Sequence, residues 1–259
     1  MVIYNLGSSI ITGLSNWFVY LRFGYEGALN SLFGILSGIA SAIIVFYPML
    51  AKRVERKTII KICMVCVAVG YGLMMTLGLT LNNLTLISLC GLFYSVGQTM
   101  FYQVLTISIA NTVEYNEWKT GKREEGIIFS VRPFMAKLGS ALQMGYVSLT
   151  LGMLGITAIT EAISKQENLF VQGAIDESTK AANITSLIAQ APDSAKTGLL
   201  ICMTVVPVVL ICIAGIIYLA KYKLTETRYD EICAEIKARK EAEVGVSEEA
   251  SEATEAVEA

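Results

Sequence analysis

Long apolar runs separated by short charged stretches dominate the chain. A helix that crosses a membrane needs about 20 mainly apolar residues, and six segments reach that length. They are residues 2–21, 28–50, 59–79, 84–110, 127–159 and 197–220. The fifth run is longer than a bilayer requires, so it must tilt, kink or project. The pattern predicts an all-α membrane protein with a bundle of six transmembrane helices over residues 1–223.

The remaining segments are polar. Residues 161–196 are expected to form a loop outside the membrane, with some helix around 179–190. Residues 224–240 are expected to form a helix at the cytoplasmic surface. The tail, 241–259, has seven glutamates and neither lysine nor arginine. Such a composition predicts a disordered, solvated segment.

Loop charge predicts the orientation of the bundle. Cytoplasmic loops of membrane proteins carry an excess of lysine and arginine. With six spans, three basic clusters fall on one side of the membrane: Lys52, Arg53, Arg56 and Lys57; Lys119, Lys122 and Arg123; Lys221 and Lys223. That side is therefore expected to be cytoplasmic, and both termini with it. The expected location is the cell membrane.

Composition supports a membrane protein and argues against several enzyme classes. The chain is 54% hydrophobic and only 16% charged, whereas a soluble domain carries about 25% charged residues. The net charge of -2 and the lack of a basic face argue against nucleic-acid binding. The chain has no histidine, which removes Ser-His-Asp catalysis and histidine zinc sites. The six cysteines do not follow the spacing of a disulfide framework. We expect no enzyme activity, no metal site and no cofactor.

Polar side chains recur at helical spacing inside three of the apolar runs. The first run carries Asn5, Ser9, Thr12 and Asn16 on one face, with Tyr20 one turn further. The fourth carries Tyr94, Gln98 and Tyr102, and the fifth carries Ser130, Arg132, Lys137, Ser140 and Gln143. Polar groups in hydrocarbon need partners or water. Such stripes either join helices or face a wet cavity, and three stripes in one small bundle favour the cavity.

Lys137 is the sharpest single candidate. It lies about ten residues into the fifth run, where an ammonium group costs at least ~2.5–3.5 kcal/mol on insertion scales. We expect it to line a substrate or ion path, the alternative being a side chain that snorkels to the interface. Tyr20, Tyr94 and Tyr102 could stack on a sugar and hydrogen-bond to it, or lie in an interfacial belt.

The charged stretch between the fourth and fifth runs resembles a known family. The sequence EYNEWKTGKREEGIIFSVRPFMAKLGSAL, residues 114–142, is similar to the hallmark of the glycoside–pentoside–hexuronide:cation symporters, the melibiose-carrier group. PMLAKRVERKTIIK, residues 48–61, resembles a basic cytoplasmic turn of major facilitator transporters. Matching positions of the hallmark are Glu114, Tyr115, Glu117, Lys119, Thr120, Gly121, Arg123, Glu125, Gly126, Phe129, Ser130, Phe134, Lys137 and Gly139.

The resemblance implies the carboxy-terminal six-helix half of a twelve-helix sugar carrier, with the amino-terminal half absent. In that family, Na+ or H+ is held mainly by aspartates of the other half, so this chain is not expected to hold the coupling ion. The resemblance places Lys137 in the cavity and Tyr102 near the sugar. The partners it implies are membrane lipid, a sugar and the missing half. It also implies a cytoplasmic latch of ion pairs, formed by Glu114, Glu117, Lys119, Arg123 and Glu125.

Three functions remain open at this point. The chain is half of a sugar:cation symporter, or a half-carrier that pairs with a separate half or with itself, or a membrane scaffold that works through its acidic tail. Arg132 together with Lys137 would suit an acidic sugar such as a hexuronide.

Overall fold

The computed structural model describes residues 1–24, 35, 38–39, 42–51, 53–81 and 83–258 of the chain. Every regular element in that part is helical, as the sequence predicts. The elements are α1 (Val2–Phe23), a 3-10 helix η1 (Ala42–Phe46), α3 (Tyr47–Ala51), α4 (Arg56–Thr80), α5 (Leu84–Thr120), α6 (Glu125–Met153), α7 (Thr157–Val171), α8 (Glu177–Ala189), α9 (Asp193–Lys221) and α10 (Glu226–Glu258).

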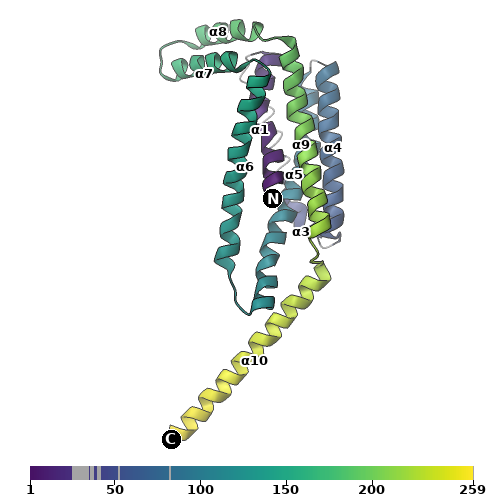
Figure 1. Ribbon diagram of the computed structural model, residues 1–259, viewed down its shortest axis with the longest axis vertical. Helices are drawn as coiled ribbons and strands as arrows, with labels where there is room; N and C mark the ends of the chain where they lie inside the picture. Colours follow the sequence, from purple (N-terminus) through teal and green to yellow (C-terminus); the bar gives the residue numbers. More distant parts are fainter. Residues whose placement is uncertain (25–34, 36–37, 40–41, 52, 82, 259) are drawn as a thin grey trace.

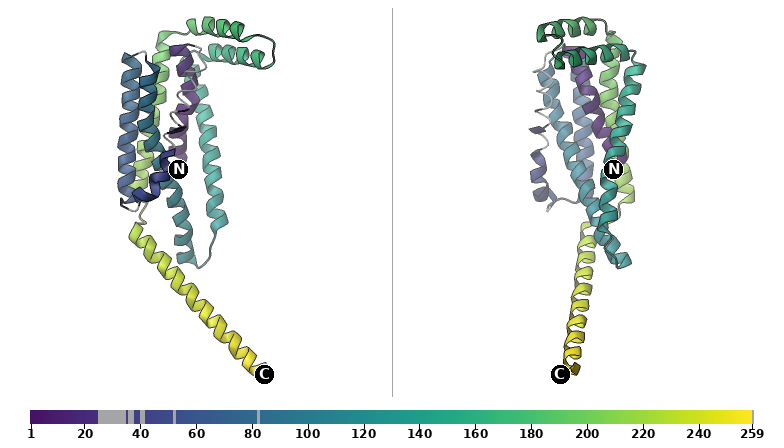
Figure 2. Two further views of the ribbon diagram at one scale, coloured as in Figure 1. Left: turned by 180° about the vertical axis from the view of Figure 1, so that it is seen from behind. Right: turned by 90° about the vertical axis from the view of Figure 1, so that its left-hand side faces the viewer.

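The long helices stand side by side, and the short ones lie across one end. Figure 1 shows α1, α4, α5, α6 and α9 running along the long axis, with α7 and α8 crossing the top and α10 leaving the bottom. Seen from behind and from the side in Figure 2, α6 stands apart on the edge of the bundle, and α1 lies between it and the rest. The most extensive helix contacts join α4 to α5, and α1 to both α9 and α6.

Among the described residues, three helices, α4, α5 and α9, are long and apolar enough to cross a membrane. A fourth span is possible by the same measure if α6 and α7 count as one broken span, although the two are bent by 116°. These helices fit a multi-pass membrane protein. Of the six spans predicted, 28–50 lies about half outside the described residues, and α1 is not among the candidate spans. We attribute the absence of α1 from the candidate spans to its polar face, because polar side chains lower the mean hydropathy of the helix.

Glycines allow the closest helix approaches in the bundle. A Cβ added at Gly70 of α4 would lie 2.5 Å from the backbone nitrogen of Tyr94 in α5. One added at Gly139 of α6 would lie 2.8 Å from Cβ of Asn5 in α1. Small residues let backbones pack closely in membrane helices. The core between the helices is large and apolar, and Phe18, Tyr71, Met74, Ile87 and Phe101 are among its fully buried side chains.

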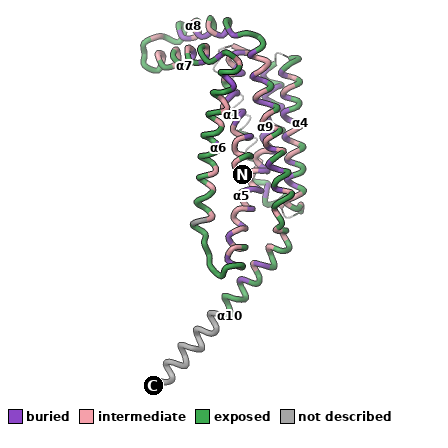
Figure 3. Tube along the Cα trace, viewed as in Figure 1, coloured by how far each residue is buried: buried purple, intermediate pink, exposed green. Residues whose placement is uncertain are grey.

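The outer faces of the bundle are apolar as well. On α4, Ile62, Val65 and Val69 are exposed, and on α9 Ile216 and Ile217 are exposed. Figure 3 shows that α6 is exposed along most of its length, whereas the buried positions lie mainly on α1, α4, α5 and α9. Large apolar surfaces of this kind are rare on soluble monomers. They suit a lipid environment or a further layer of helices.

Helix α5 differs from its predicted end. We expected the span to stop at residue 110 and a charged loop to follow, but α5 continues to Thr120. The helix ends at Gly121, whose φ of 72° is the left-handed conformation that closes many helices. The charged residues up to Lys119 therefore lie on helical turns that project beyond the apolar run. At about 1.5 Å per residue, α5 is far longer than the membrane core.

Three more segments differ from the prediction. The fifth span was expected to run to residue 159, but α6 ends at Met153 and the chain turns at Gly155, which has a φ of 69°. The loop expected over 161–196 is mostly helix, since it holds α8 and most of α7. The tail was expected to be disordered from residue 241, yet α10 continues to Glu258. Alanine and glutamate, which dominate this tail, are strong helix formers.

Candidate functional site

A buried tyrosine cluster joins α1, α4 and α5. Tyr71 and Tyr94 stack with ring centroids 4.5 Å apart. The Gln98 side chain donates a hydrogen bond to the Tyr71 hydroxyl at 2.9 Å, and the Tyr4 hydroxyl donates to the Gln98 carbonyl at 2.5 Å. The predicted candidates Tyr94 and Gln98 therefore belong to one network. Tyr4 and Tyr71 were not predicted, because each is a single tyrosine in an apolar run and outside a polar stripe.

The cluster continues to Tyr102 and Arg132, which connect α5 to α6. Arg132 Nη2 donates a hydrogen bond to the Tyr102 hydroxyl at 3.2 Å, and its guanidinium carbon lies 5.8 Å from the centre of that ring. The Tyr102 ring also stacks near Tyr4, at 6.2 Å between centroids. Both Tyr102 and Arg132 are half-buried. Two residues predicted to line the substrate path are thus in contact.

Lys137 does not join this group. It is exposed on α6, on the side opposite Gly139, which packs against α1. Five residues separate Arg132 from Lys137, so the two side chains leave α6 about 140° apart. They therefore do not share one face of α6, and their suitability for an acidic sugar stays a prediction. In the described part of the chain, Lys137 has no hydrogen-bond or ion-pair partner.

The polar face of α1 is only partly covered. The Asn5 side chain donates to the carbonyl of Met135 in α6 at 3.4 Å, whereas Asn16 is exposed. Asn16 lies about 18 Å along the helix from Tyr4, and Tyr20 lies further still. The structure therefore separates Asn16 and Tyr20 from the Tyr102–Arg132 contact.

Three of the five latch residues are connected by ion pairs. The Arg123 guanidinium contacts the carboxylates of Glu117 and Glu125, at 3.1 Å each. Lys240 of α10 reaches the other oxygen of Glu117 at 2.5 Å. The Glu117 side chain is only 8% exposed. The hydrogen bond from Lys240, and then the contact with Arg123, hold the pKa of Glu117 below its usual range against the opposing effect of burial.

The other two latch residues are not paired in the described structure. One carboxylate oxygen of Glu114 is buried without a hydrogen-bond partner, and Lys119 is exposed. The contact between α10 and the end of α5 was not predicted from the sequence. Trp118 Nε1 donates to Glu235 at 2.6 Å, and the Arg228 guanidinium lies 5.1 Å from the centre of the Trp118 indole.

A second contact holds the start of α10 against the bundle. Arg56, at the start of α4, forms an ion pair with Glu226 at 3.3 Å and also donates its backbone N–H to that carboxylate at 2.9 Å. The Arg56 guanidinium lies 5.7 Å from the centre of the Tyr229 ring. Helix α10 is therefore attached to the ends of both α4 and α5.

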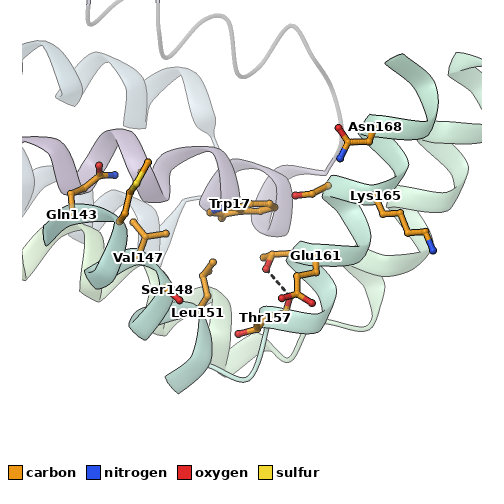
Figure 4. A pocket seen from close by; sticks show the side chains of 13 residues that line it. Trp17, Gln143, Val147, Ser148, Leu151, Thr157, Glu161, Lys165 and Asn168 are labelled. Carbon is orange, nitrogen blue, oxygen red and sulfur yellow. Dashed lines mark hydrogen bonds between the residues drawn. The ribbon is translucent and has the colours of Figure 1, made fainter. Parts of the chain in front are cut away.

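A cavity with both polar and apolar lining lies at the opposite end of the bundle. Its volume is about 580 Å³, and α1, α6 and α7 form its walls. Figure 4 shows Trp17 near its middle, with side chains of α6 and α7 around it. The sequence did not predict this cavity, because α7 was expected to be part of a loop. Among the described residues, no group of three or more acidic, cysteine or histidine side chains could hold a metal ion.

Comparisons with known proteins give consistent results. A sequence profile of the family described as MFS/sugar transport protein matches residues 3–226. The lactose permease of Lactobacillus delbrueckii subsp. bulgaricus is 30% identical over 161 residues, which cover 61% of this chain and 25% of the permease. The raffinose carrier protein of Pediococcus pentosaceus is 28% identical over 62% of this chain and 25% of its own length. The uncharacterized symporter YnaJ of Bacillus subtilis is 26% identical over 80% of this chain and 38% of its own length. The chain thus spans from a quarter to well under half of the length of these relatives.

Proposed function

Since the chain belongs to the MFS/sugar transport protein family, we propose that it is the carboxy-terminal six-helix half of a sugar:cation symporter. Carriers of this kind consist of two helix bundles that rock about a central site. The match over residues 3–226 is the observation that carries the proposal. The named relatives include a lactose permease and a raffinose carrier, which supports a sugar as the substrate.

The uncovered face of α6 supports a second bundle as the missing partner. Lys137 and Ser148 are exposed on that face, and so are Phe134 and Met144. A face of lipid-exposed helix would not carry an ammonium group at this depth without a large cost. In the complete carrier this face borders the second bundle and the wet cavity between the two. Lys137 then lines that cavity.

The sugar path in this half runs along α5 and α6. Tyr102 offers an apolar ring and a hydroxyl at the edge of the buried tyrosine cluster, and Arg132 offers donors beside it. A sugar has apolar C–H faces and many hydroxyls, so such a pair can both stack and hydrogen-bond. Lys137 acts from the other side of α6, on a group that enters between the two bundles.

The end that carries α10 is the cytoplasmic end in this account. The first turn of α4, the end of α5 and the end of α9 meet there (Figure 1), and they carry a large share of the basic residues. Lysine and arginine accumulate on the cytoplasmic side of membrane proteins. The contacts of Glu117, Arg123 and Glu125 then form a latch on the cytoplasmic side. Partly exposed ion pairs are weak, which suits contacts that break in every transport cycle.

The coupling ion, Na+ or H+, binds in the other half. Among the described spanning helices, α1 and α4 contain no aspartate or glutamate, and those of α5 and α9 lie at helix ends. The isolated chain is therefore expected to show no coupled uptake in vesicles. Coupled uptake by the purified chain alone would contradict this assignment.

A membrane scaffold is the second candidate, because α10 projects far beyond the bundle (Figure 1). Removing residues 241–259 separates the two functions. The truncation spares Lys240 and every contact of α10 described above, so a carrier should keep its uptake of sugar. A scaffold that works through its acidic end should lose its activity. A stand-alone half-carrier would be identified by co-purification of a second six-helix chain with this one.

The direct test of the sugar path is Lys137→Ala in the complete carrier, with Lys137→Arg as the conservative variant. We expect Ala to reduce sugar uptake strongly and Arg to restore part of it, because Arg keeps the positive charge. Equal sugar uptake by the parent carrier, Lys137→Ala and Lys137→Arg would show that Lys137 does not line the sugar path.

A further inference from the structure

One wall of the cavity beside Trp17 comes from α7. The chain turns sharply at Gly155, which carries α7 across the end of α1 and α6. Six residues of α7 line the cavity: Thr157, Thr160, Glu161, Ser164, Lys165 and Asn168. Their spacing of three and four places them on one face of the helix. All six are polar and all but Thr160 are exposed, so a polar face of α7 borders an open cavity of about 580 Å³.

The opposite face of α7 explains how this helix is held. Its buried Ile163 belongs to the same apolar cluster as Ile184 of α8. Asn183 donates to Gln166 at 2.9 Å, and Lys180 contacts Glu167 at 3.8 Å. Helix α8 therefore supports α7 from behind, and the polar face of α7 is left for the cavity.

The cavity combines an aromatic surface with unused hydrogen-bonding groups. Figure 4 shows the Trp17 indole in the middle, with Gln143 on one side and Glu161 on the other. Within the described ranges, no hydrogen bond joins the side chain of Gln143, Glu161 or Asn168 to another residue, whereas Thr160 donates to the backbone carbonyl of Thr157 at 2.9 Å. Val147 and Leu151 complete an apolar floor. Small-molecule sites are of this size and combine apolar walls with a few polar groups.

Charge selects among the sugars that could enter. Glu161 and Lys165 are the charged residues that line the cavity, and in Figure 4 the Lys165 side chain extends away from the indole whereas Glu161 lies beside it. A carboxylate next to the aromatic surface accepts hydrogen bonds from hydroxyl groups and repels a uronate.

We propose that the cavity formed by Trp17, Gln143, Glu161 and Asn168 is a second binding site, which takes a neutral sugar unit at the outer end of the bundle. The choice of a sugar rests on the proposed function. In this site the sugar ring stacks on the Trp17 indole, and its hydroxyls bond to Glu161 and the two amides. The sugar meets this site before it reaches Tyr102 and Arg132.

The two tryptophans of the chain allow a direct measurement. They are Trp17 and Trp118, and Trp118 lies at the other end of the bundle, against α10. In the Trp118→Phe variant, Trp17 is the single tryptophan reporter. Lactose added to the purified full chain should change its fluorescence in a saturable way. The Trp17→Phe variant, with Trp118 left, should show no such change.

Variants of the wall identify the site. In the Trp118→Phe background, Glu161→Ala should weaken lactose binding about tenfold, as expected for one hydrogen bond to a charged group. Glu177→Ala is the matched control, because Glu177 is exposed on neighbouring α8 and does not line the cavity. It should bind lactose like the parent. Glucuronate should bind more weakly than lactose, and Glu161→Gln should narrow that difference.

The proposal is overturned if lactose leaves Trp17 fluorescence unchanged, or if Glu161→Ala and Glu177→Ala bind lactose equally. Sugar uptake by the complete carrier, measured in parallel, separates this site from the proposed function. Uptake that persists without any Trp17 response removes the outer site alone. If neither a Trp17 response nor sugar uptake is found, the outer site and the proposed sugar transport are both contradicted.

Discussion

The contact between Tyr102 and Arg132 can be tested by a double-mutant cycle. Arg132→Gln removes the guanidinium, Tyr102→Phe removes only the hydroxyl, and Tyr102→Leu removes the ring as well. The 3.2 Å hydrogen bond is the interaction lost in the phenylalanine cycle. Hydrogen bonds between membrane helices contribute about 0.6 kcal/mol on average and at most about 1.7. We therefore expect a coupling energy of about 1 kcal/mol between Tyr102→Phe and Arg132→Gln.

The leucine cycle should give a larger coupling. The guanidinium lies 5.8 Å from the centre of the Tyr102 ring, and such a cation–π contact adds about 0.5–1 kcal/mol. The assay is thermal unfolding of the detergent-purified chain. At about 2–4 °C per kcal/mol for a chain of this size, the coupling should appear as about 2–4 °C in the phenylalanine cycle and about 3–8 °C in the leucine cycle. Additive changes in both cycles, within about 0.5 kcal/mol, would refute the contact.

Further predictions concern charge and packing. Lys137→Ala should leave the melting temperature of the chain unchanged, because no described residue pairs with Lys137, while uptake by the complete carrier falls. Gly70→Ala should cost about 1–3 kcal/mol of stability, because its Cβ would overlap the α5 backbone, whereas Gly72→Ala, with open space around it, should be neutral or stabilising. The pKa of Glu117 is lowered, so its ion pairs stabilise the α5–α10 contact at every pH above the usual carboxyl pKa. This stabilisation is lost as the pH falls from the usual pKa through the lowered pKa of Glu117. Trp118 fluorescence in a Trp17→Phe background should report that acid transition, and Glu117→Gln should abolish it; an unchanged transition in that variant would contradict the assignment.

The helical class and most long helices followed from hydrophobic length, but the helix ends did not. The apolar run of α5 stops near residue 110, and we took this as the end of the helix. Hydrogen bonding along the backbone does not require apolar side chains, so α5 continues until Gly121 provides a left-handed residue. At Gly155 the same local conformation ends α6 before the apolar pattern does. Periodicity locates buried faces more reliably than it locates ends.

Contacts between distant segments were the least predictable part of the site. Tyr94, Gln98, Tyr102 and Arg132 share polar stripes, and the structure brings them together. Tyr71 completes the cluster from α4, but a lone tyrosine in an apolar run carries no signal of its own. Lys240 and Glu235 lie more than 110 residues from Glu117 and Trp118, the residues they contact. The cavity beside Trp17 depended on the turn at Gly155, which directs α7 across the bundle.

Sugar counterflow tests the central claim most directly. A tagged copy of this chain would be expressed in its own cells and purified from the membrane together with whatever it binds. This purified particle would be reconstituted in vesicles loaded with unlabelled lactose. The entry of labelled lactose would then be measured, with raffinose and glucuronate tested in parallel. We expect counterflow of at least one of these sugars, and its loss when the chain carries Lys137→Ala. A particle that exchanges none of the three sugars, or one that exchanges them equally well with Lys137→Ala, would contradict a sugar path along α6.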